Sequence, residues 1–319
     1  MTDPADISAS TRSVGFLGKL PARGDFVRQH VSDRVGAELE QWLQKSSQNL
    51  YQAKTDLPAQ PLRFVFTAPN SQSAAIGTLI KSQDQVGRSF PLAIYTHVPL
   101  KQAHANLPAL PVAFAQFFAG AEQVLGAAAQ LSVEQLRDAV AQVAPSADAQ
   151  WPQAVDATAR ALQATDAQSL LAALFQAAPP DAFYYGLYTF CAASGPVRSA
   201  PPSSAATVLD CPSSQPVALS AWLDLARRRL AWAQFCPSFV WSEGDAGRLL
   251  LSLGAASDQL LHFVVDPKHT SARLWPLISQ RADAIARARA DLAGVASALS
   301  SGNAANIDAL WSVVMQVSV

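Results

Sequence analysis

Three short apolar runs follow one another closely in the first third of the chain, and they constrain the fold more than any other feature. They cover residues 62–67, 74–80 and 90–98; the first alternates in polarity, and the last is rich in β-branched and aromatic residues. The first run stops before Pro69 and the last before Pro99. Because connections this short suit antiparallel neighbours, the sequence predicts strands that pair in reversed directions.

Further strand-like runs alternate with helical patterns along the rest of the chain. Strands are expected at residues 13–17, 207–209, 238–242 and 248–252. Apolar residues return every three or four positions in several stretches, which predicts helices at 35–50 (with Ser32 as N-cap), 110–128, 219–233, 258–265 and 276–300. Strands in the early, middle and late thirds, with helices between them, fit a sheet that is covered on both faces. We therefore predict an α/β fold, a three-layer α/β/α sandwich with a mixed sheet.

Composition along the chain suggests how it is organised. Residues 1–12 are polar and are expected to form a flexible N-terminal tail. Residues 13–275 are expected to form one α/β domain, with a motif core at 13–130 and an Ala-rich helical insertion at about 131–176. Because Ala-rich polar helices have little to bury, those of the insertion are expected to pack peripherally. Residues 276–319 are expected to form a C-terminal helical extension.

Charge and cysteine content exclude several classes of function. Half of the 319 residues are hydrophobic, and the formal net charge is −1. Binding to nucleic acid needs a basic excess, and attachment to an anionic membrane needs a polybasic patch, so neither is expected. The three cysteines form no C-x-x-C pair and suit reduced thiols. The first ten residues lack a signal-peptide pattern, and the apolar stretch 114–131 is interrupted by Gln116 and Glu122. We expect no membrane insertion and a cytoplasmic location.

Two turns, about seventy residues apart, place charged side chains next to apolar runs. They contribute five candidate site residues: Lys19, Arg23 and Asp25 from the first turn, and Asp84 and Arg88 from the second. One interpretation is a surface that recognises an anion or docks a partner, because arginine presents a rigid fork of donors. The other is an internal network in which Asp25 and Asp84 pair with Arg23 and Arg88 and tie the two loops together.

No reaction can be written from the residues alone. A phosphate-binding P-loop needs four residues between its glycines and a Ser or Thr after the lysine, whereas only two residues separate Gly15 from Gly18 and Leu20 follows the lysine. Ser89 lacks the second glycine of a nucleophile elbow. The five histidines are scattered and no pair has metal-ligand spacing. We predict no catalytic residue, no metal and no cofactor.

The two charged segments nevertheless have distinctive sequences and a distinctive order along the chain. Residues 15–26 read GFLGKLPARGDF, and residues 84–92 read DQVGRSFPL. Together with the Trp42-bearing helix, the run 64–67 and the Gly77 run between them, these motifs resemble the TagF family, also called ImpM, of bacterial type VI secretion. The resemblance covers about the first hundred residues, and weaker similarity returns at 237–241 and at the helix that begins at Asp258.

The resemblance implies a TagF-like α/β domain in an accessory protein that restrains type VI secretion after translation. It also implies a partner, because the better-studied family members act through a forkhead-associated-domain scaffold, by a route separate from threonine phosphorylation. The partner is thus expected to be such a scaffold or another secretion component, and the protein is expected not to be an enzyme. The five charged residues are expected to support the motif loops or to bind that partner.

An alternative from a different class also follows from the charged turns. Charge concentrated at strand ends, where α/β folds usually place ligands, suits an enzyme acting on a phosphate ester or another anionic substrate. Replacing Arg23 or Asp25 by alanine would test it, because loss of turnover without unfolding would favour the enzyme.

Overall fold

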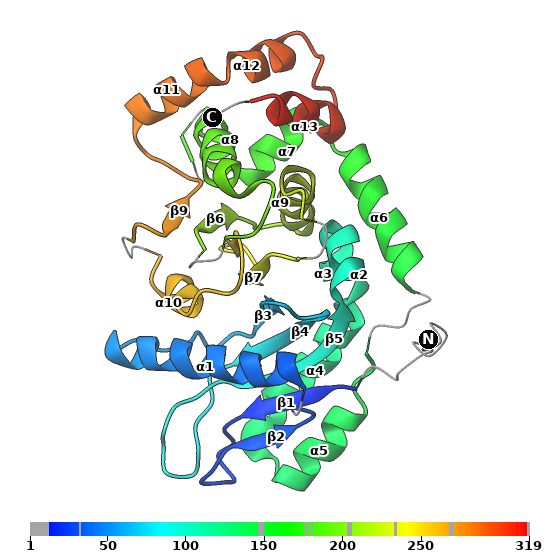
Figure 1. Cartoon of the computed structure of the whole chain (residues 1–319), viewed down its shortest axis with the longest axis vertical. Coiled ribbons are helices and arrows are strands. Elements are labelled where there is room, and N and C mark those ends of the chain that lie inside the picture. Colours follow the sequence, from blue (N-terminus) through cyan, green and yellow to red (C-terminus); the bar gives the residue numbers. More distant parts are fainter. Residues whose placement is uncertain are drawn as a thin grey trace.

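A nine-stranded open sheet runs through the part of the chain that the computed structural model describes (Figure 1), with the strand order β2-β1-β5-β4-β3-β7-β8-β6-β9. The described residues are 13–31, 33–145, 150–175, 178–179, 181–202, 206–232, 235–267 and 271–317. The predicted tail, residues 1–12, lies outside them. The strands are β1 (Gly15–Gly18), β2 (Val27–Gln29), β3 (Leu62–Thr67), β4 (Ser73–Ile80), β5 (Leu92–Pro99), β6 (Val208–Pro212), β7 (Ser238–Trp241), β8 (Arg248–Ser252) and β9 (Leu274–Pro276).

The sheet is mostly antiparallel. Strands β3, β4 and β5 pair in sequence with reversed directions, as their short connections predict. Of the pairs among the described strands, β6 with β9 is the parallel one. The prediction of an α/β fold with a mixed sheet is therefore confirmed.

The two faces of the sheet bury different sets of helices. Alternate residues of a strand point to opposite faces, so Phe64 joins one core cluster and Val65 joins the other. The smaller cluster contains side chains of α1 and α10, and the larger one contains those of most other helices. The helices are α1 (Arg34–Gln52), α2 (Leu100–Ala105), α3 (Leu110–Ala113), α4 (Ala115–Ala127), α5 (Val133–Ala141), α6 (Trp151–Ala164), α7 (Ala167–Leu174), α8 (Ala182–Ser194), α9 (Pro216–Arg229), α10 (Leu260–Val265), α11 (Ala282–Asp291), α12 (Ala293–Ser300) and α13 (Ile307–Met315), with short 3-10 turns at Leu107–Ala109, Ala128–Gln130 and Gly195–Val197.

Helix α1 lies across one face of the sheet (Figure 1) because its apolar stripe matches the helical period. Trp42, from this stripe, packs on Phe64 and Phe66 with ring centroids 6.2 and 5.5 Å away. The helix begins after Asp33, whose carboxylate accepts a hydrogen bond from the Gly36 N–H at 2.8 Å. The N-cap is thus Asp33 and not Ser32, which itself lies outside the described residues.

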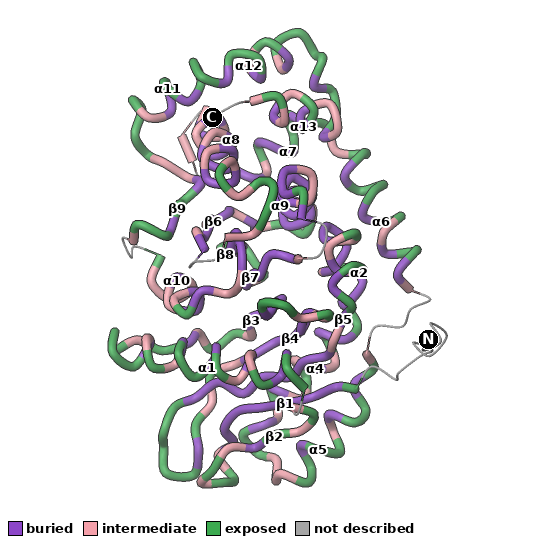
Figure 2. Tube along the Cα trace, in the orientation of Figure 1, coloured by how far each residue is buried: buried purple, intermediate pink, exposed green. Residues whose placement is uncertain are grey.

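The Ala-rich segment forms α5, α6 and α7, each of which buries a narrow apolar side in the larger core cluster. Trp151, at the start of α6, packs edge-on against Phe114 with ring centroids 5.5 Å apart. The opposite sides of α5 and α6 are exposed (Figure 2). These helices therefore form an outer layer that is nevertheless anchored to the core.

The last part of the chain departs from the single long helix predicted at 276–300. Residues Leu274–Pro276 form the edge strand β9, and the helical stretch after it is broken into α11 and α12 at Leu292, whose φ of −103° and ψ of 32° are not helical. Leu292 is almost fully buried, so the break turns an apolar side chain into the core. The division into a domain at 13–275 and an extension at 276–319 stays a prediction.

Candidate functional site

The two charged turns meet because of the strand order. Strand β1 pairs antiparallel with β5, so the end of β1 lies beside the start of β5 and therefore beside the loop that leads into it from β4. Gly18 fits tightly at this junction. A Cβ atom built on it would lie 2.2 Å from the carbonyl oxygen of Pro91, and its φ of 145° is one that side-chain-bearing residues rarely adopt.

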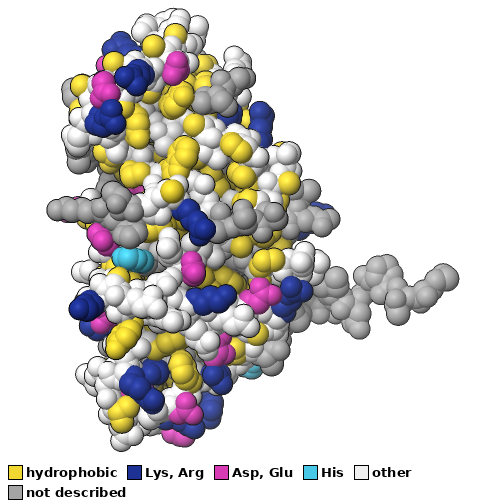
Figure 3. Space-filling view, turned by 60° about the vertical axis from the view of Figure 1, so that its left-hand side comes forward, with side chains coloured by type: hydrophobic (Ala, Val, Ile, Leu, Met, Phe, Trp, Pro, Cys, Tyr) yellow, Lys and Arg dark blue, Asp and Glu magenta, His cyan; other side chains and the backbone are white. Residues whose placement is uncertain are grey.

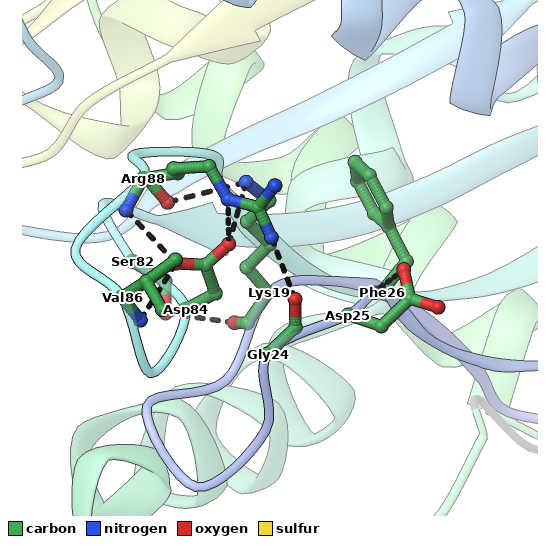
Figure 4. A network of polar contacts seen from close by, with 8 residues as sticks. All are labelled: Lys19, Gly24, Asp25, Phe26, Ser82, Asp84, Val86 and Arg88. Carbon is green, nitrogen blue, oxygen red and sulfur yellow. Dashed lines mark hydrogen bonds and ion pairs between the residues drawn. The ribbon is translucent and has the colours of Figure 1, made fainter.

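Asp84 is the buried centre of the site (Figure 4). Its Oδ2 atom lies 2.9 Å from the Lys19 ammonium and 2.6 Å from the Arg88 Nε, and its Oδ1 atom accepts hydrogen bonds from the backbone N–H groups of Val86 and Arg88. The Asp84 side chain is fully buried and that of Lys19 nearly so, whereas the Arg88 side chain is 63% exposed. Four donors therefore converge on one carboxylate.

This environment holds the carboxylate in its ionised form. Burial alone would raise the pKa of Asp84, but the hydrogen bonds from the Arg88 backbone, the Lys19 ammonium and the Arg88 guanidinium outweigh it and hold that pKa well below its usual range. A carboxylate with so low a pKa is a weak base at neutral pH. Its geometry suits the shaping of a loop.

Additional contacts tie the second loop to the first. The Arg88 Nη2 donates to the Gly24 carbonyl at 2.6 Å, and the Gln85 backbone N–H donates to the Arg23 carbonyl at 3.0 Å (Figure 4 shows the former). The Ser82 hydroxyl donates to the Lys19 carbonyl at 2.8 Å. The two loops are thus one structural unit, held by backbone as well as side-chain groups.

An aromatic contact extends this unit toward the start of β5. The Phe26 ring packs edge-on against Phe90 at 4.8 Å between centroids, and the Lys19 ammonium lies 5.4 Å from the centre of the Phe26 ring. Lys19 therefore serves both as the partner of Asp84 and as a cation over an aromatic ring.

The structure brings together three of the five predicted site residues and leaves two at the surface. Lys19, Asp84 and Arg88 form the network. The interpretation as an internal network therefore holds for Asp84 and Arg88 of the second turn. The first turn contributes Lys19 to it, and not the predicted Arg23. Within the described part of the chain, Arg23 and Asp25 form no ion pair, and both are exposed; the Asp25 carboxylate accepts from the Phe26 N–H at 2.7 Å. The pairing predicted between Asp25 and an arginine is wrong, because the carboxylate is turned to its own backbone.

Comparison with known proteins assigns the segment that builds this unit. Residues 15–143 match the family described as "TagF N-terminal domain, Type VI secretion system-associated". These residues therefore form a TagF N-terminal domain. They supply both charged loops and the five adjacent strands β1–β5.

A solved structure is also similar to the chain. It is described as the crystal structure of PA0076 from Pseudomonas aeruginosa PAO1, and it is 20% identical, with a TM-score of 0.45. The match covers 83% of this chain and 99% of that one. Among curated proteins no match is found.

A hollow of about 780 Å³ adjoins the network around Asp84, and the sequence patterns did not indicate it. It is lined by the last turn of α1, by residues that follow α1, and by the loop between β4 and β5, including Arg88 and Phe90. Tyr51 lines it and is 84% exposed. The signal available in the sequence was that Tyr51 is a large aromatic residue next to Leu50, off the buried stripe of α1.

Other chemistry-bearing side chains are dispersed over the described part of the chain. Among the residues that the structure describes, no group of three His, Cys, Asp or Glu side chains could hold a metal ion. Cys191, Cys211 and Cys236 are buried, and burial raises the pKa of each thiol. His97 lies 3.2 Å from the Asp33 carboxylate, and burial lowers the pKa of its imidazole.

Within the described ranges, no single helix is long and apolar enough to span a membrane. One bent pair, 107–113 with 115–130 at an angle of 53°, passes the test by length and composition. The Phe117 and Phe118 side chains of that pair are fully buried in the larger core cluster.

Proposed function

We propose that this protein is a cytoplasmic, non-enzymatic accessory protein of type VI secretion that restrains secretion after translation by binding another protein of the system. The first candidate partner is a forkhead-associated-domain scaffold. The observation that carries the proposal is the TagF match over residues 15–143, which includes both charged loops.

The geometry of the loops supports binding over bond-breaking. The Asp84 carboxylate is saturated by four donors, and its low pKa makes it a poor proton acceptor at neutral pH. The network instead fixes a surface on which Arg23, Asp25 and the guanidinium of Arg88 are exposed. Charged side chains on a rigid surface favour specificity and rapid association between proteins.

The test is secretion measured in a deletion strain, in an overexpressing strain and in strains with paired substitutions. We expect deletion to raise secretion and overexpression to lower it. The double substitution Arg23→Ala with Asp25→Ala should weaken the effect of overexpression and the recovery of the scaffold in a pull-down. Unchanged secretion on both deletion and overexpression would contradict the proposal.

A matched control is available elsewhere in the chain. Arg281 and Asp283 have the same spacing as Arg23 and Asp25, are also exposed, and pair with each other at 2.7 Å near the start of α11. Arg281→Ala with Asp283→Ala should leave secretion as in the wild type. The control separates a role of the first charged loop from a general effect of removing two surface charges.

The enzyme predicted as an alternative is distinguished by the same variants. A hollow beside Arg88 is the feature that would receive an anionic substrate. Turnover of a phosphate ester that is lost in Arg23→Ala or Asp25→Ala, with folding retained, would favour the enzyme over the binding protein.

A further inference from the structure

The groove beside the second charged loop has an apolar floor and open walls. Leu50, Leu57 and Phe90 form its floor and belong to the core cluster under α1. One wall is the end of α1 and the residues that follow it, and the other is the loop 81–91, fixed in place by Asp84. Because one wall is already fixed, less conformational entropy is lost when a ligand binds in the groove.

Two exposed apolar side chains mark the edge of this groove. Tyr51, in its wall, is 84% exposed, and Val86, next to the lining residue Gly87, is 70% exposed. They are the two most exposed of the large hydrophobic side chains that the structure describes. Tyrosine is one of the residue types that contribute most of the binding energy in protein interfaces once a partner covers them.

The charge of the groove is predominantly positive. Lys54, Lys81 and Arg88 line it together with one carboxylate, Asp56, which pairs with Lys81 at 2.7 Å. Within the described residues, Lys54 has no ion-pair partner, and the exposed guanidinium of Arg88 retains an Nη1 group without a hydrogen-bond acceptor. Figure 3 shows Lys, Arg, Asp and Glu side chains mixed with hydrophobic ones at the lower end of the molecule, the end at which β1 and β2 lie in Figure 1.

We infer that this groove receives an acidic segment of a partner protein, in which carboxylates flank an aliphatic or aromatic side chain. The apolar side chain packs on the floor and against Tyr51, and the carboxylates face Lys54 and Arg88. The inference deepens the proposed function and rests on it, because it adds a groove that shares Arg88 with the surface of Arg23 and Asp25 and gives the chemistry of what the groove binds.

The experiment uses the full chain in a secreting strain, with the photocrosslinker p-benzoyl-phenylalanine placed at position 51 or 86. Position 112, where Val112 in α3 is 42% exposed, is the control. The captured segment is sequenced by mass spectrometry and synthesised as a labelled peptide. Its dissociation constant is then measured for the wild type and for variants.

We expect crosslinks from positions 51 and 86, but not from 112, to a segment with net negative charge. Tyr51→Ala and Lys54→Glu should each weaken binding of the peptide at least about tenfold. Lys101→Glu, an exposed lysine on α2, should change it little. Binding should also weaken as salt is raised, because exposed charges are screened.

Other outcomes overturn the inference. A neutral or basic captured segment, a crosslink to a second copy of this chain, or equal capture from position 112 would each do so. If the wild type lowers secretion and Lys54→Glu lowers it equally, the groove is not the docking site although the proposed function stands. If the wild type does not lower secretion, the proposed function fails and the inference fails with it.

Discussion

Asp84 shows how one carboxylate can organise two loops that are distant in sequence. It accepts hydrogen bonds from its own loop through Oδ1, and it binds Lys19 of the other loop through Oδ2. Removing it would leave the ammonium of Lys19, whose side chain is 9% exposed, without its carboxylate. At the scale of single residues, this is the substitution to which the site is most sensitive.

We predict that Asp84→Asn lowers the free energy of unfolding at neutral pH, because the amide N–H group would face the donors of Lys19 and Arg88. The depressed pKa of Asp84 in the folded state means that its contribution is present above the unfolded pKa of about 3.9 and is lost as the pH falls toward the folded pKa. Below about pH 4, the slope of the free energy of unfolding against pH should therefore be smaller in the variant, by the contribution of about one bound proton. Urea unfolding from pH 7 to pH 3 measures both effects.

Asp25→Asn is the matched control for that experiment. Asp25 is exposed and accepts a hydrogen bond from the adjacent Phe26 N–H, so its loss should change stability little. Equal acid limbs in the wild type and in Asp84→Asn would contradict the assignment of the network.

At the scale of elements, the contact between β1 and the start of β5 sets the position of both loops. We predict that Gly18→Ala destabilises the protein by about 3 kcal/mol or more, because the new methyl group would meet the Pro91 carbonyl oxygen and the Leu92 Cα, and because φ is 145°. Chemical denaturation measures the loss. Secretion control should fall with it, since both loops depend on this contact.

Gly126→Ala provides the opposite expectation in the same protein. Gly126 lies in α4, and nothing stands within 4 Å of a Cβ atom built on it. Its replacement should stabilise the protein by up to about 1 kcal/mol. If both variants lose stability alike, the close approach at Gly18 is not the cause.

The predictable elements are those in which the pattern of apolar and polar side chains extends over the whole element. Strands β3 and β8 match their predicted bounds because five or more residues alternate or run apolar between turn residues. Strands β2 and β9 were missed because each has three residues, one of them buried, which is too short for an alternating pattern to be recognised. The break at Leu292 was missed because its apolar repeat continues through both α11 and α12.

The site was predictable as a set of charged turns but not as a set of pairs. Nothing in the spacing of Lys19 and Asp84 shows that β1 and β5 are neighbours, and that adjacency decides which cation meets the carboxylate. The groove was not predictable because its walls, Tyr51 and Arg88, come from segments joined by the same tertiary arrangement.

At the scale of the whole molecule, the reactivity of the three thiols can show when the part of the protein after the TagF match unfolds. Cys191, Cys211 and Cys236 lie in α8, in β6 and just before β7, and all are fully buried. Burial raises the pKa of Cys236 to about 12. We predict that none reacts with a thiol reagent at pH 8 until the protein unfolds, because the reactive thiolate is both scarce and inaccessible.

The measurement is the rate of thiol labelling as guanidinium chloride is raised. Three thiols per chain should react in the unfolded protein, at midpoints that coincide with loss of tryptophan fluorescence. One thiol that reacts early would contradict a single cooperative unit and would locate a region that opens by itself.

Strands β3 and β7 join the TagF part of the sheet to the remainder through three paired positions, from Arg63 with Trp241 to Val65 with Phe239. If the chain were divided after residue 143, each fragment would expose the edge of an unpaired strand. This strand is β3 in the first fragment and β7 in the second. The same cut would divide the larger core cluster, which contains Val65 from one part and Leu209 from the other, so we expect neither fragment to fold unless the two are made together.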